Sequence, residues 1–450
     1  MSRTIKLNKG YDIKLIGEVA TTLGSTEAPK TYSIKPSDFK GLTPKLQIEV
    51  GKEVKAGTPL YFFKELPEVF VTSPVSGEVI EINRGEKRVI LEIKILADSN
   101  TSYETFATGN PESLDATAVK STLLNSGAWL SLTQRPFGKV ADPTDKPKSI
   151  FISGFDSAPL APDYNFVLQG RESDFQTGIN ALKKLTEGKV YLNLKAGDKH
   201  CAAFTGAKGV ETTLFDGPHP AGCVGVQIHH LDPIAKGQIV WTINPEDVAN
   251  IGKLFNSGQY DAERTVALSG SEVNDGARKY YKIKAGASVE GLLKANTSAS
   301  HNRVISGNVL SGTKVTDGYL RYYDRQLTVI PEGEEPEFMG WLIPTYKRPS
   351  VSKTFLSYLF PNRKYKVNTN PHGERRAFVM TGEYEKVTPM DLYPQFLLKA
   401  ILANDLEGME TLGILEVVEE DLALCEFICT SKTPVQNILR SGLTLIEKEG

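Results

Sequence analysis

The sequence predicts a multidomain protein that combines α/β and β-rich domains with a mainly helical C-terminal region. At 450 residues the chain is long enough for about three domains with sizeable cores. Residues 149–194 alternate strand, helix and strand, which indicates a parallel α/β unit. Short alternating strands with Gly-containing turns precede this unit and return after it. We therefore expect four parts, at residues 1–98, 99–262, 263–330 and 331–450.

The composition argues against two common classes of partner. Lys and Arg number 52 against 54 Asp and Glu, so no strong overall field favours nucleic acid or anionic lipid. The chain has no apolar run of about 18 residues, and its first residues lack the apolar stretch of a signal peptide. We expect no direct insertion into a membrane. Four cysteines in a chain of this length are typical of a reducing compartment.

The first part, residues 1–98, contains short strands with alternating apolar side chains and regularly spaced Gly-Lys and Ser-Gly turns. This pattern resembles the barrel-sandwich hybrid of biotinyl and lipoyl carrier domains. Carrier domains hold a Lys at the tip of a hairpin, and the tip here falls near Leu66 and Pro67, with Lys64 off the tip. We therefore expect an unmodified β-module, against the alternative of a lipoyl or biotin carrier.

Residues 99–262 are expected to form a Rossmann-like α/β domain. A capping Asn and a terminal Gly frame a predicted helix over residues 111–127. Residues 149–155 and 189–194 have the apolar character of buried strands, and residues 172–185 carry apolar side chains at a helical spacing. The order strand, helix, strand implies a right-handed parallel unit. No G-x-G-x-x-G motif follows any predicted strand, which makes nucleotide binding doubtful.

Residues 124–142 resemble a flavin-binding loop in which other residues replace the glycines. In the flavin-binding subunits of NADH:quinone reductases, a Ser-Gly pair leads into a glycine-rich run that ends near Phe-Pro. The glycines let the backbone approach the flavin phosphate and direct N–H groups at it. Ser126, Gly127 and Phe137 keep the two ends of this pattern. The side chains expected to fill the space of the cofactor are Trp129, Leu130, Leu132, Gln134 and Arg135.

Two further segments resemble redox sites that have lost their functional residues. The turn at residues 153–163 resembles an acidic turn that holds nicotinamide nucleotide in flavin subunits, but Ser-Ala-Pro at residues 157–159 replaces the acidic positions. Cys425 and Cys429 form a C-x3-C pair, the end of the C-x2-C-x2-C-x3-C pattern that binds an iron–sulfur cluster. Because two thiolates cannot complete a set of four ligands, we expect both cysteines to pack in a core.

Residues 216–233 contain three of the six histidines, among closely spaced prolines and glycines. The prolines fix their own φ angles and the glycines permit sharp bends, so the segment is expected to form a rigid loop that presents His219. A metal site would need three or four ligands. His229 and His230 are adjacent and would point apart on a strand. We therefore expect hydrogen-bonded histidines and no metal site.

The last two parts differ in character. Residues 263–330 follow the order strand, turn, short helix and glycine-flanked strand, which resembles a soluble-ligand-binding β-grasp (SLBB) domain. Domains of this type often serve as docking modules. Residues 331–349 are rich in Pro and Glu and are expected to be irregular. The rest of the C-terminal region, to residue 450, is expected to be mainly helical.

Taken in order along the chain, these features resemble the A subunits of bacterial Na+-translocating NADH:quinone reductases. The resemblance covers the whole chain and is carried by residues 72–88, 219–232, 302–313 and 419–429. More distant similarity links the chain to the C subunit of the Rnf electron-transport complex, which keeps its flavin and cluster sites. Flavin-binding subunits of respiratory NADH dehydrogenases are similar at the same level.

The resemblance implies a peripheral subunit on the cytoplasmic face of the bacterial inner membrane, within an oxidoreductase that is also a translocase. That complex oxidises NADH, passes electrons through flavins and iron–sulfur centres of other subunits to ubiquinone or menaquinone, and exports Na+. The implied partners are the other subunits, especially the quinone-bearing membrane subunit.

Within such a complex, we expect this chain to bind no cofactor and to contain no complete active site. Its expected role is assembly or contact on the quinone side. The candidate residues for contact with quinone or a partner are His219, Pro220, His229 and Asp232. A neutral imidazole donates a hydrogen bond to a quinone carbonyl or to a backbone carbonyl of a partner. The alternative is a flavin- and NADH-binding electron-entry subunit like the Rnf C subunit, which the lost glycines, acidic turn and cysteines oppose.

Overall fold

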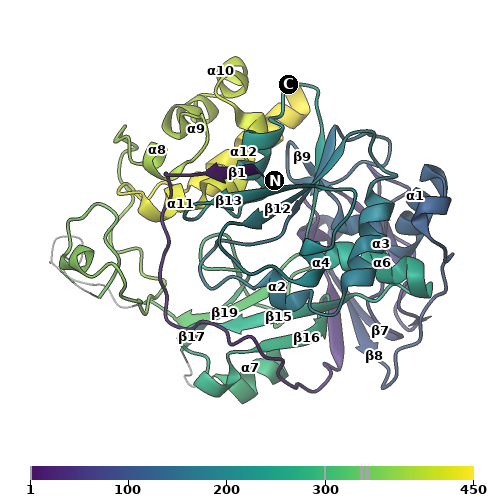
Figure 1. The fold of residues 1–450 in the computed structure, drawn as a ribbon. Helices are drawn as coiled ribbons and strands as arrows, with labels where there is room; N and C mark the ends of the chain where they lie inside the picture. The colour runs from purple at the N-terminus through teal and green to yellow at the C-terminus, as the bar shows by residue number, and fades with distance from the viewer. Residues whose placement is uncertain (1–2, 298–300, 335–338, 340–344, 346) are drawn as a thin grey trace.

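A seven-stranded sheet forms the centre of the α/β domain (Figure 1). The computed structural model describes residues 3–297, 301–334, 339, 345 and 347–450. The strand order in the sheet is β1-β13-β12-β11-β14-β9-β10. The strands β1, β13, β12, β11 and β14 run parallel, and β9 and β10 add an antiparallel hairpin at one edge. The predicted Rossmann-like α/β domain is thereby confirmed.

The strands and helices of this domain follow the predicted order. The strands are β9 (Thr133–Arg135), β10 (Lys139–Val140), β11 (Ser149–Ser153), β12 (Lys189–Lys195), β13 (Glu211–Asp216) and β14 (Val240–Ile243). The helices are α1 (Ala116–Ser126), α2 (Tyr164–Val167), α3 (Glu172–Leu182), α4 (Ala202–Thr205), α5 (Val224–Leu231) and α6 (Pro245–Ser257). The single helix predicted over residues 111–127 was wrong in one respect. Leu114 is extended, so a 3-10 turn (Pro111–Ser113) precedes α1, which Asp115 caps.

The first module contains the predicted barrel-sandwich hybrid, built from two small sheets. One sheet has the order β2-β8-β7-β4 and the other the order β3-β5-β6. The strands are β2 (Thr31–Ile34), β3 (Pro44–Leu46), β4 (Glu53–Val54), β5 (Pro59–Phe63), β6 (Phe70–Thr72), β7 (Gly77–Arg84) and β8 (Ile90–Ala97). Between β5 and β6, Lys64 directly follows the strand and Leu66 folds back into the core.

The first strand lies outside this module, although the sequence-based boundaries include it in residues 1–98. Strand β1 (Arg3–Lys6) pairs in parallel with β13 at the edge of the α/β sheet. The chain then crosses the molecule before it enters the first module (Figure 1, purple). On this path Leu15 forms a β-bridge with Tyr365 of the C-terminal region, and Leu23 forms one with Tyr280 of the third part. The N-terminal segment therefore ties three parts together.

The third part has the β-grasp arrangement that the sequence predicted. Its mixed sheet has the order β16-β15-β19-β17-β18, with β15 and β19 as parallel neighbours. The elements are β15 (Glu263–Ser269), β16 (Tyr280–Lys284), α7 (Glu290–Asn296), β17 (Asn302–Ser306), β18 (Thr313–Lys314) and β19 (Gln326–Pro331). Just before β19, the buried guanidinium of Arg325 forms ion pairs with Glu246 at 3.0 Å and Asp247 at 2.6 Å. These pairs fasten the β-grasp domain to the start of α6.

The C-terminal region is helical from Tyr384 onward, as predicted, but residues 350–383, which were also expected to be mainly helical, contain only one 3-10 turn. A 3-10 turn (Leu356–Leu359) precedes α8 (Tyr384–Val387), α9 (Pro394–Leu402), α10 (Leu406–Thr411), α11 (Glu419–Ile428) and α12 (Val435–Glu449). The prediction for residues 331–349 lies in part on residues outside the described ones. Helices α11 and α12 share a core with the α/β domain, because Phe215 and Val226 pack in the same cluster as Leu422 and Leu439.

Candidate functional site

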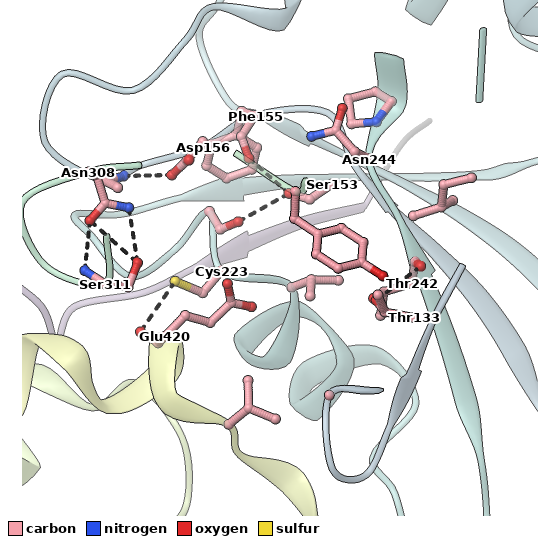
Figure 2. A pocket seen from close by; sticks show the side chains of 18 of the residues that line it. Thr133, Ser153, Phe155, Asp156, Cys223, Thr242, Asn244, Asn308, Ser311 and Glu420 are labelled. Carbon is pink, nitrogen blue, oxygen red and sulfur yellow. Dashed lines mark hydrogen bonds between the residues drawn. The ribbon is translucent and has the colours of Figure 1, made fainter. Parts of the chain in front are cut away.

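A cavity of about 330 Å³ lies where the central sheet reverses its strand order. After β11 the chain builds β12 and β13 on one side, then returns to place β14 on the other side of β11. In open α/β sheets, ligand sites form outside the carboxyl ends of the strands at such a switch point. Residues of the 153–158 segment, after β11, and Thr242 and Asn244, at the end of β14, line this cavity (Figure 2). It is therefore the candidate functional site.

Segments from the other parts of the chain complete the walls of the cavity. The loop at residues 124–142 that resembles a flavin-binding loop, called the degenerate loop below, contributes residues within 131–138. The Pro/Gly segment contributes residues within 219–224 and the β-grasp domain residues within 308–311. The start of helix α11 and the residue before it contribute residues within 418–423. Figure 2 shows Glu420 of α11 beside Cys223, with Asn308 and Ser311 at one end of the cavity. Lys40 of the first module also lines the cavity, so the site lies at the junction of all four parts.

The degenerate loop fills its interior with its own side chains. Trp129, Leu130 and Leu132 are fully buried. The indole Nε1 of Trp129 donates to the backbone oxygen of Ala141 at 2.8 Å, and its ring packs edge-on against Trp241 with centroids 5.3 Å apart. These contacts place an apolar core where the resembling flavin loops keep an open glycine-lined surface.

Arg135 of the same loop reaches across to helix α11. Its Nη1 lies 2.7 Å from Oδ2 of Asp421 and its Nη2 lies 2.6 Å from Oε1 of Glu420. Burial alone would lower the pKa of Arg135, but the charges of Asp421 and Glu420 hold it above its usual value. Asp421 is fully buried and also accepts from the backbone N of Val418 at 2.9 Å. The loop and the start of α11 are therefore joined by a buried, charge-assisted contact.

Two carboxyl groups line the cavity. Burial raises the pKa of Asp156, although the backbone N of Ala158 donates to its Oδ1 at 2.7 Å. Burial also raises the pKa of Glu420; the charge of Arg135 opposes this shift, and the charge of Asp421 adds to it. Both carboxyls therefore retain a proton to higher pH than they would in water.

His219 lines the cavity and contacts the hydroxyl of Ser157. The hydroxyl of Ser157 accepts from the backbone N of Gly222 at 2.8 Å and lies 3.0 Å from Nδ1 of His219. A hydrogen bond from this hydroxyl to Nδ1 places the ring proton on Nε2. That Nε2 is buried and has no hydrogen-bond partner in the described part of the chain. Burial lowers the pKa of His219 to about 4, so the ring is neutral at pH 7.

The other predicted contact residues are placed differently. Pro220 is buried beside His219, whereas neither His229 nor Asp232 lines the cavity. His229 contacts Oε2 of Glu416 through Nδ1 at 2.7 Å and accepts from a backbone N–H through Nε2 at 3.0 Å. Asp232 forms an ion pair with Lys148 at 2.5 Å. These two residues connect elements of the structure, and only His219 and its neighbours reach the cavity.

The expectation that adjacent histidines lie on a strand was wrong. His229 and His230 belong to helix α5, and their rings pack edge-on with centroids 5.2 Å apart. The Pro/Gly turn before α5 is shorter than expected, because the helix begins at Val224.

Cys425 and Cys429 lie in the C-terminal core, as predicted. Both are buried; Sγ of Cys425 lies 3.3 Å from Oγ1 of Thr388, and Sγ of Cys429 accepts from the backbone N of Thr433 at 3.3 Å. Across the described residues, no set of three or more His, Cys, Asp or Glu side chains is arranged to hold a metal ion. Within the same residues, no helix combines the length and the apolar character needed to cross a bilayer.

Three residues of the cavity were not predicted from the sequence. Asp156 directly precedes the Ser-Ala-Pro turn, which was judged only by its lost acidic positions. Tyr164, whose pKa burial raises, receives a hydrogen bond from Nδ2 of Asn244 at 2.5 Å. Glu420 stands in the helix that carries the cysteine pair. The available signal was position, since Asp156 directly follows the strand predicted over residues 149–155; Asn244 follows β14, a strand that was not predicted.

Three family models match successive parts of the chain. They describe the NqrA N-terminal barrel-sandwich hybrid domain at residues 5–98, the NqrA second alpha/beta domain at 114–260, and the NQRA C-terminal domain at 265–317. The A subunit of the Na(+)-translocating NADH-quinone reductase of Yersinia pseudotuberculosis is 38% identical, with 99% of this chain and 100% of the relative covered. The proteins of the same name from Haemophilus influenzae and Vibrio atlanticus are 37% and 36% identical, with the same coverage.

Among solved structures, the air-oxidized state of an NAD+-reducing [NiFe]-hydrogenase is similar over 78% of this chain and 67% of that one. Its sequence identity is 10% and its TM-score 0.38, which is too weak a likeness to support a conclusion. The full-length relatives, in contrast, share more than a third of their residues with this chain. The chain belongs to the A-subunit family of the Na+-translocating NADH-quinone reductase.

Proposed function

We propose that this chain is a peripheral, cofactor-free subunit of the Na+-translocating NADH-quinone reductase on the cytoplasmic face of the bacterial inner membrane. In the proposed role it carries no electrons and serves assembly and contact on the quinone side. NADH, flavins, iron–sulfur centres and quinone then belong to the other subunits, above all the quinone-bearing membrane subunit. Nucleic acid has no part in this role.

The contact of Arg135 with Asp421 and Glu420 is the observation that supports this proposal most strongly. A loop that holds a flavin phosphate needs free backbone N–H groups and room beside them. In this chain a buried guanidinium and two tryptophan rings occupy the corresponding loop and its surroundings. The other partner in the contact is α11, the helix that carries the incomplete cysteine motif. The two segments that resemble redox sites thus contact each other through these ion pairs.

The competing function is a flavin- and NADH-binding electron-entry subunit. It would require the loop at residues 124–142 to open and Arg135 to leave its carboxylate partners. Removing one member of a buried ion pair costs about 3–5 kcal/mol. Opening the loop would also expose Trp129, Leu130 and Leu132, which are fully buried. We therefore favour the cofactor-free role.

The location can be tested by fractionating cells of the native organism. We expect the chain to sediment with membranes when the other subunits are present, and to move largely to the soluble fraction when the genes for the membrane subunits are deleted. The physical reason is that the described residues contain no helix able to cross a bilayer. An undiminished membrane fraction after that deletion would contradict attachment through the partner subunits.

We also propose a second, narrower role in which the cavity receives a ring with a carbonyl acceptor, such as a quinone headgroup. The unpartnered Nε2–H of His219 supplies the donor, and the neutral state of the ring keeps it available across the physiological range. Pro220 supports the turn, while His229 and Asp232 hold the segment to its surroundings. Contact with another subunit through the same residues is the alternative within this proposal.

The replacement His219→Gln separates these roles, because Gln keeps a donor but changes its position and direction. Reduction of quinone by the assembled complex is compared with reduction of an artificial acceptor that takes electrons upstream. A fall of about tenfold in quinone reduction alone, equivalent to one lost hydrogen bond to the ligand, supports the quinone-side role. Loss of assembly supports a docking role. Unchanged assembly and activity would leave His219 a purely structural residue.

A further inference from the structure

The 3-10 turn at Leu356–Leu359 exposes its large apolar side chains and buries its polar one, the opposite of an ordinary protein surface. Leu356, Tyr358, Leu359 and Phe360 are 55%, 50%, 63% and 54% exposed. Ser357, the small polar residue among them, is turned inward and is 2% exposed. A surface turn in water normally exposes its polar residue and buries its large apolar ones. Four adjacent large apolar side chains held outward therefore indicate a surface made for a non-aqueous contact.

This turn is a defined structure with several hydrogen bonds. The backbone N of Phe355 donates to Oγ of Ser350 at 3.0 Å, and the backbone N of Phe360 donates to the oxygen of Ser357 at 3.0 Å. At its base, Tyr365 is buried and its backbone bonds to the N-terminal segment on both sides of Leu15. The apolar side chains are thus presented by an anchored loop that projects beyond the sheets and helices, at the left of Figure 1.

The chain segment that carries the turn contains only basic charged residues. Residues 347–366 contain six Lys and Arg and no Asp or Glu, in a chain whose net charge is −2. Lys364 and Lys366 are paired with Glu18 and Glu272 of the body. Lys353 lies 5.5 Å from the ring centre of Tyr358 at the turn itself, and the exposed Arg363 donates its backbone N–H to the oxygen of Phe360. The rim of the apolar turn is therefore positively charged.

We propose that this apolar turn inserts into the interfacial layer of a bilayer that contains anionic lipid. Apolar tips with an aromatic residue among them, ringed by Lys and Arg, match the acyl boundary and the anionic headgroups above it. The proposal rests on the proposed place of the chain in a membrane complex, which brings it to a bilayer. This shallow insertion departs from the expectation of no direct insertion. A single four-residue turn holds the subunit only weakly by itself, so it orients the subunit on the membrane to which its partners recruit it.

The form of the surface favours lipid over a protein partner. The turn projects, and the segment that carries it, residues 347–366, supplies only basic side chains, which complement the anionic headgroups of a bilayer. The short turn also suits shallow insertion, because it needs no backbone group to enter the hydrocarbon region unpaired. A protein surface of acidic and apolar character is the competing occupant, and the test distinguishes the two.

The test is co-sedimentation of the purified full-length chain with vesicles. One set contains equal parts of phosphatidylglycerol and phosphatidylcholine, and the other contains phosphatidylcholine alone. We expect binding to the anionic vesicles that weakens roughly fivefold for each of Lys353→Gln and Arg363→Gln, and that falls in high salt. The paired replacement Leu359→Ser with Phe360→Ser should lower the partition coefficient about tenfold or more.

A matched control exists on helix α9. Phe396 and Leu402 are 53% and 58% exposed, so Phe396→Ser with Leu402→Ser removes the same two side-chain types at similar exposure. We expect this control to bind vesicles like the unaltered chain, with all variants unfolding at the same temperature. Equal weakening in both pairs, or no preference of the unaltered chain for anionic vesicles, overturns the proposal. The proposal also fails if the turn variant binds vesicles normally but is lost from the complex, since that result identifies a protein partner. These vesicle results are independent of whether the chain co-purifies with the reductase.

Discussion

His219 illustrates how a single buried side chain acquires defined chemistry from its neighbours. The sequence pointed to this residue because prolines and glycines surround it, and it does line the cavity. Its tautomer and its lowered pKa depend on Ser157 and on burial, and Ser157 lies 62 residues earlier in the chain. No local pattern contains that information, so the position of His219 was predictable and its proton was not.

The lowered pKa predicts how His219 affects stability. In the unfolded chain the imidazole takes up a proton near pH 6.5, but in the folded chain it does so only near pH 4. Protons then bind preferentially to the unfolded state between these values, so stability falls as the pH decreases from 6.5 to 4. His219→Gln removes this loss. In urea unfolding, we expect the unaltered chain to lose about 3 kcal/mol more than the variant between pH 7 and pH 4.

The comparison itself corrects for the carboxyl groups that titrate in the same range, since both proteins share them. If the two proteins lose stability in parallel as the pH falls, His219 titrates normally and the buried, neutral ring is excluded.

Arg135 and Asp156 mark the limit of prediction for individual residues. The side chain of Arg135 was expected to fill the loop, and it is buried there. Its partners on α11 lie 285 and 286 residues away, and pairing at that separation has no signal in one sequence. Asp156 was overlooked because the turn was judged only by residues 157–159, where Ser-Ala-Pro replaces the acidic residues of flavin subunits. Strand order, known only from the fold, reveals why that position matters.

Among the helices and strands, regular patterns were predicted well and short elements poorly. Strands β11 and β12 and helix α3 have clear apolar periodicity, and the structure places them as expected. Helix α5 spans only eight residues after a Pro/Gly turn, so the whole segment at residues 216–233 was expected to form a loop. Strand β1 has four residues, none of them buried, and its pairing with β13 depends on tertiary contacts that propensity does not contain.

The buried contact between β9 and α11 predicts a large loss of stability on replacing Arg135. Arg135→Met fills a similar volume but leaves Asp421 buried without its charge partner. We expect a loss of about 3–5 kcal/mol in the free energy of unfolding. The matched control is Lys146→Met, which removes an exposed pair with Glu187 in the same domain and should cost less than about 1 kcal/mol. Both are measured by chemical denaturation.

A similar small loss for both replacements would mean that the loop and α11 are held together by other contacts. The double variant Arg135→Met/Asp421→Leu should recover part of the stability that Arg135→Met loses, since Asp421 then leaves no unpaired buried charge. Failure of that pair to recover any stability would contradict the ion pair as the link between the two segments.

Across the whole molecule, the described large apolar side chains that are exposed are unevenly distributed. They lie in the N-terminal 98 residues and in the region after residue 331, and none belongs to the α/β or β-grasp domains. The α/β and β-grasp domains thus expose no large apolar side chains among the described residues, whereas the first and last parts of the chain expose several that are available for contacts. This arrangement fits a subunit that docks through its outer parts. Composition alone predicted the even overall charge, but it concealed the local run of basic residues at 347–366.

The proposed function depends above all on the two segments that resemble redox sites, which contact each other and which we propose bind no electron carrier. The sharpest test is the visible absorption spectrum of the full-length chain, purified anaerobically from its native cell, together with analyses for flavin and iron. We predict a colourless protein with neither flavin nor iron, because Arg135 and the tryptophans occupy the loop and only two cysteines remain at α11. Stoichiometric flavin, or about four irons per chain, would show that at least one of the two sites is functional and that the proposed role is wrong.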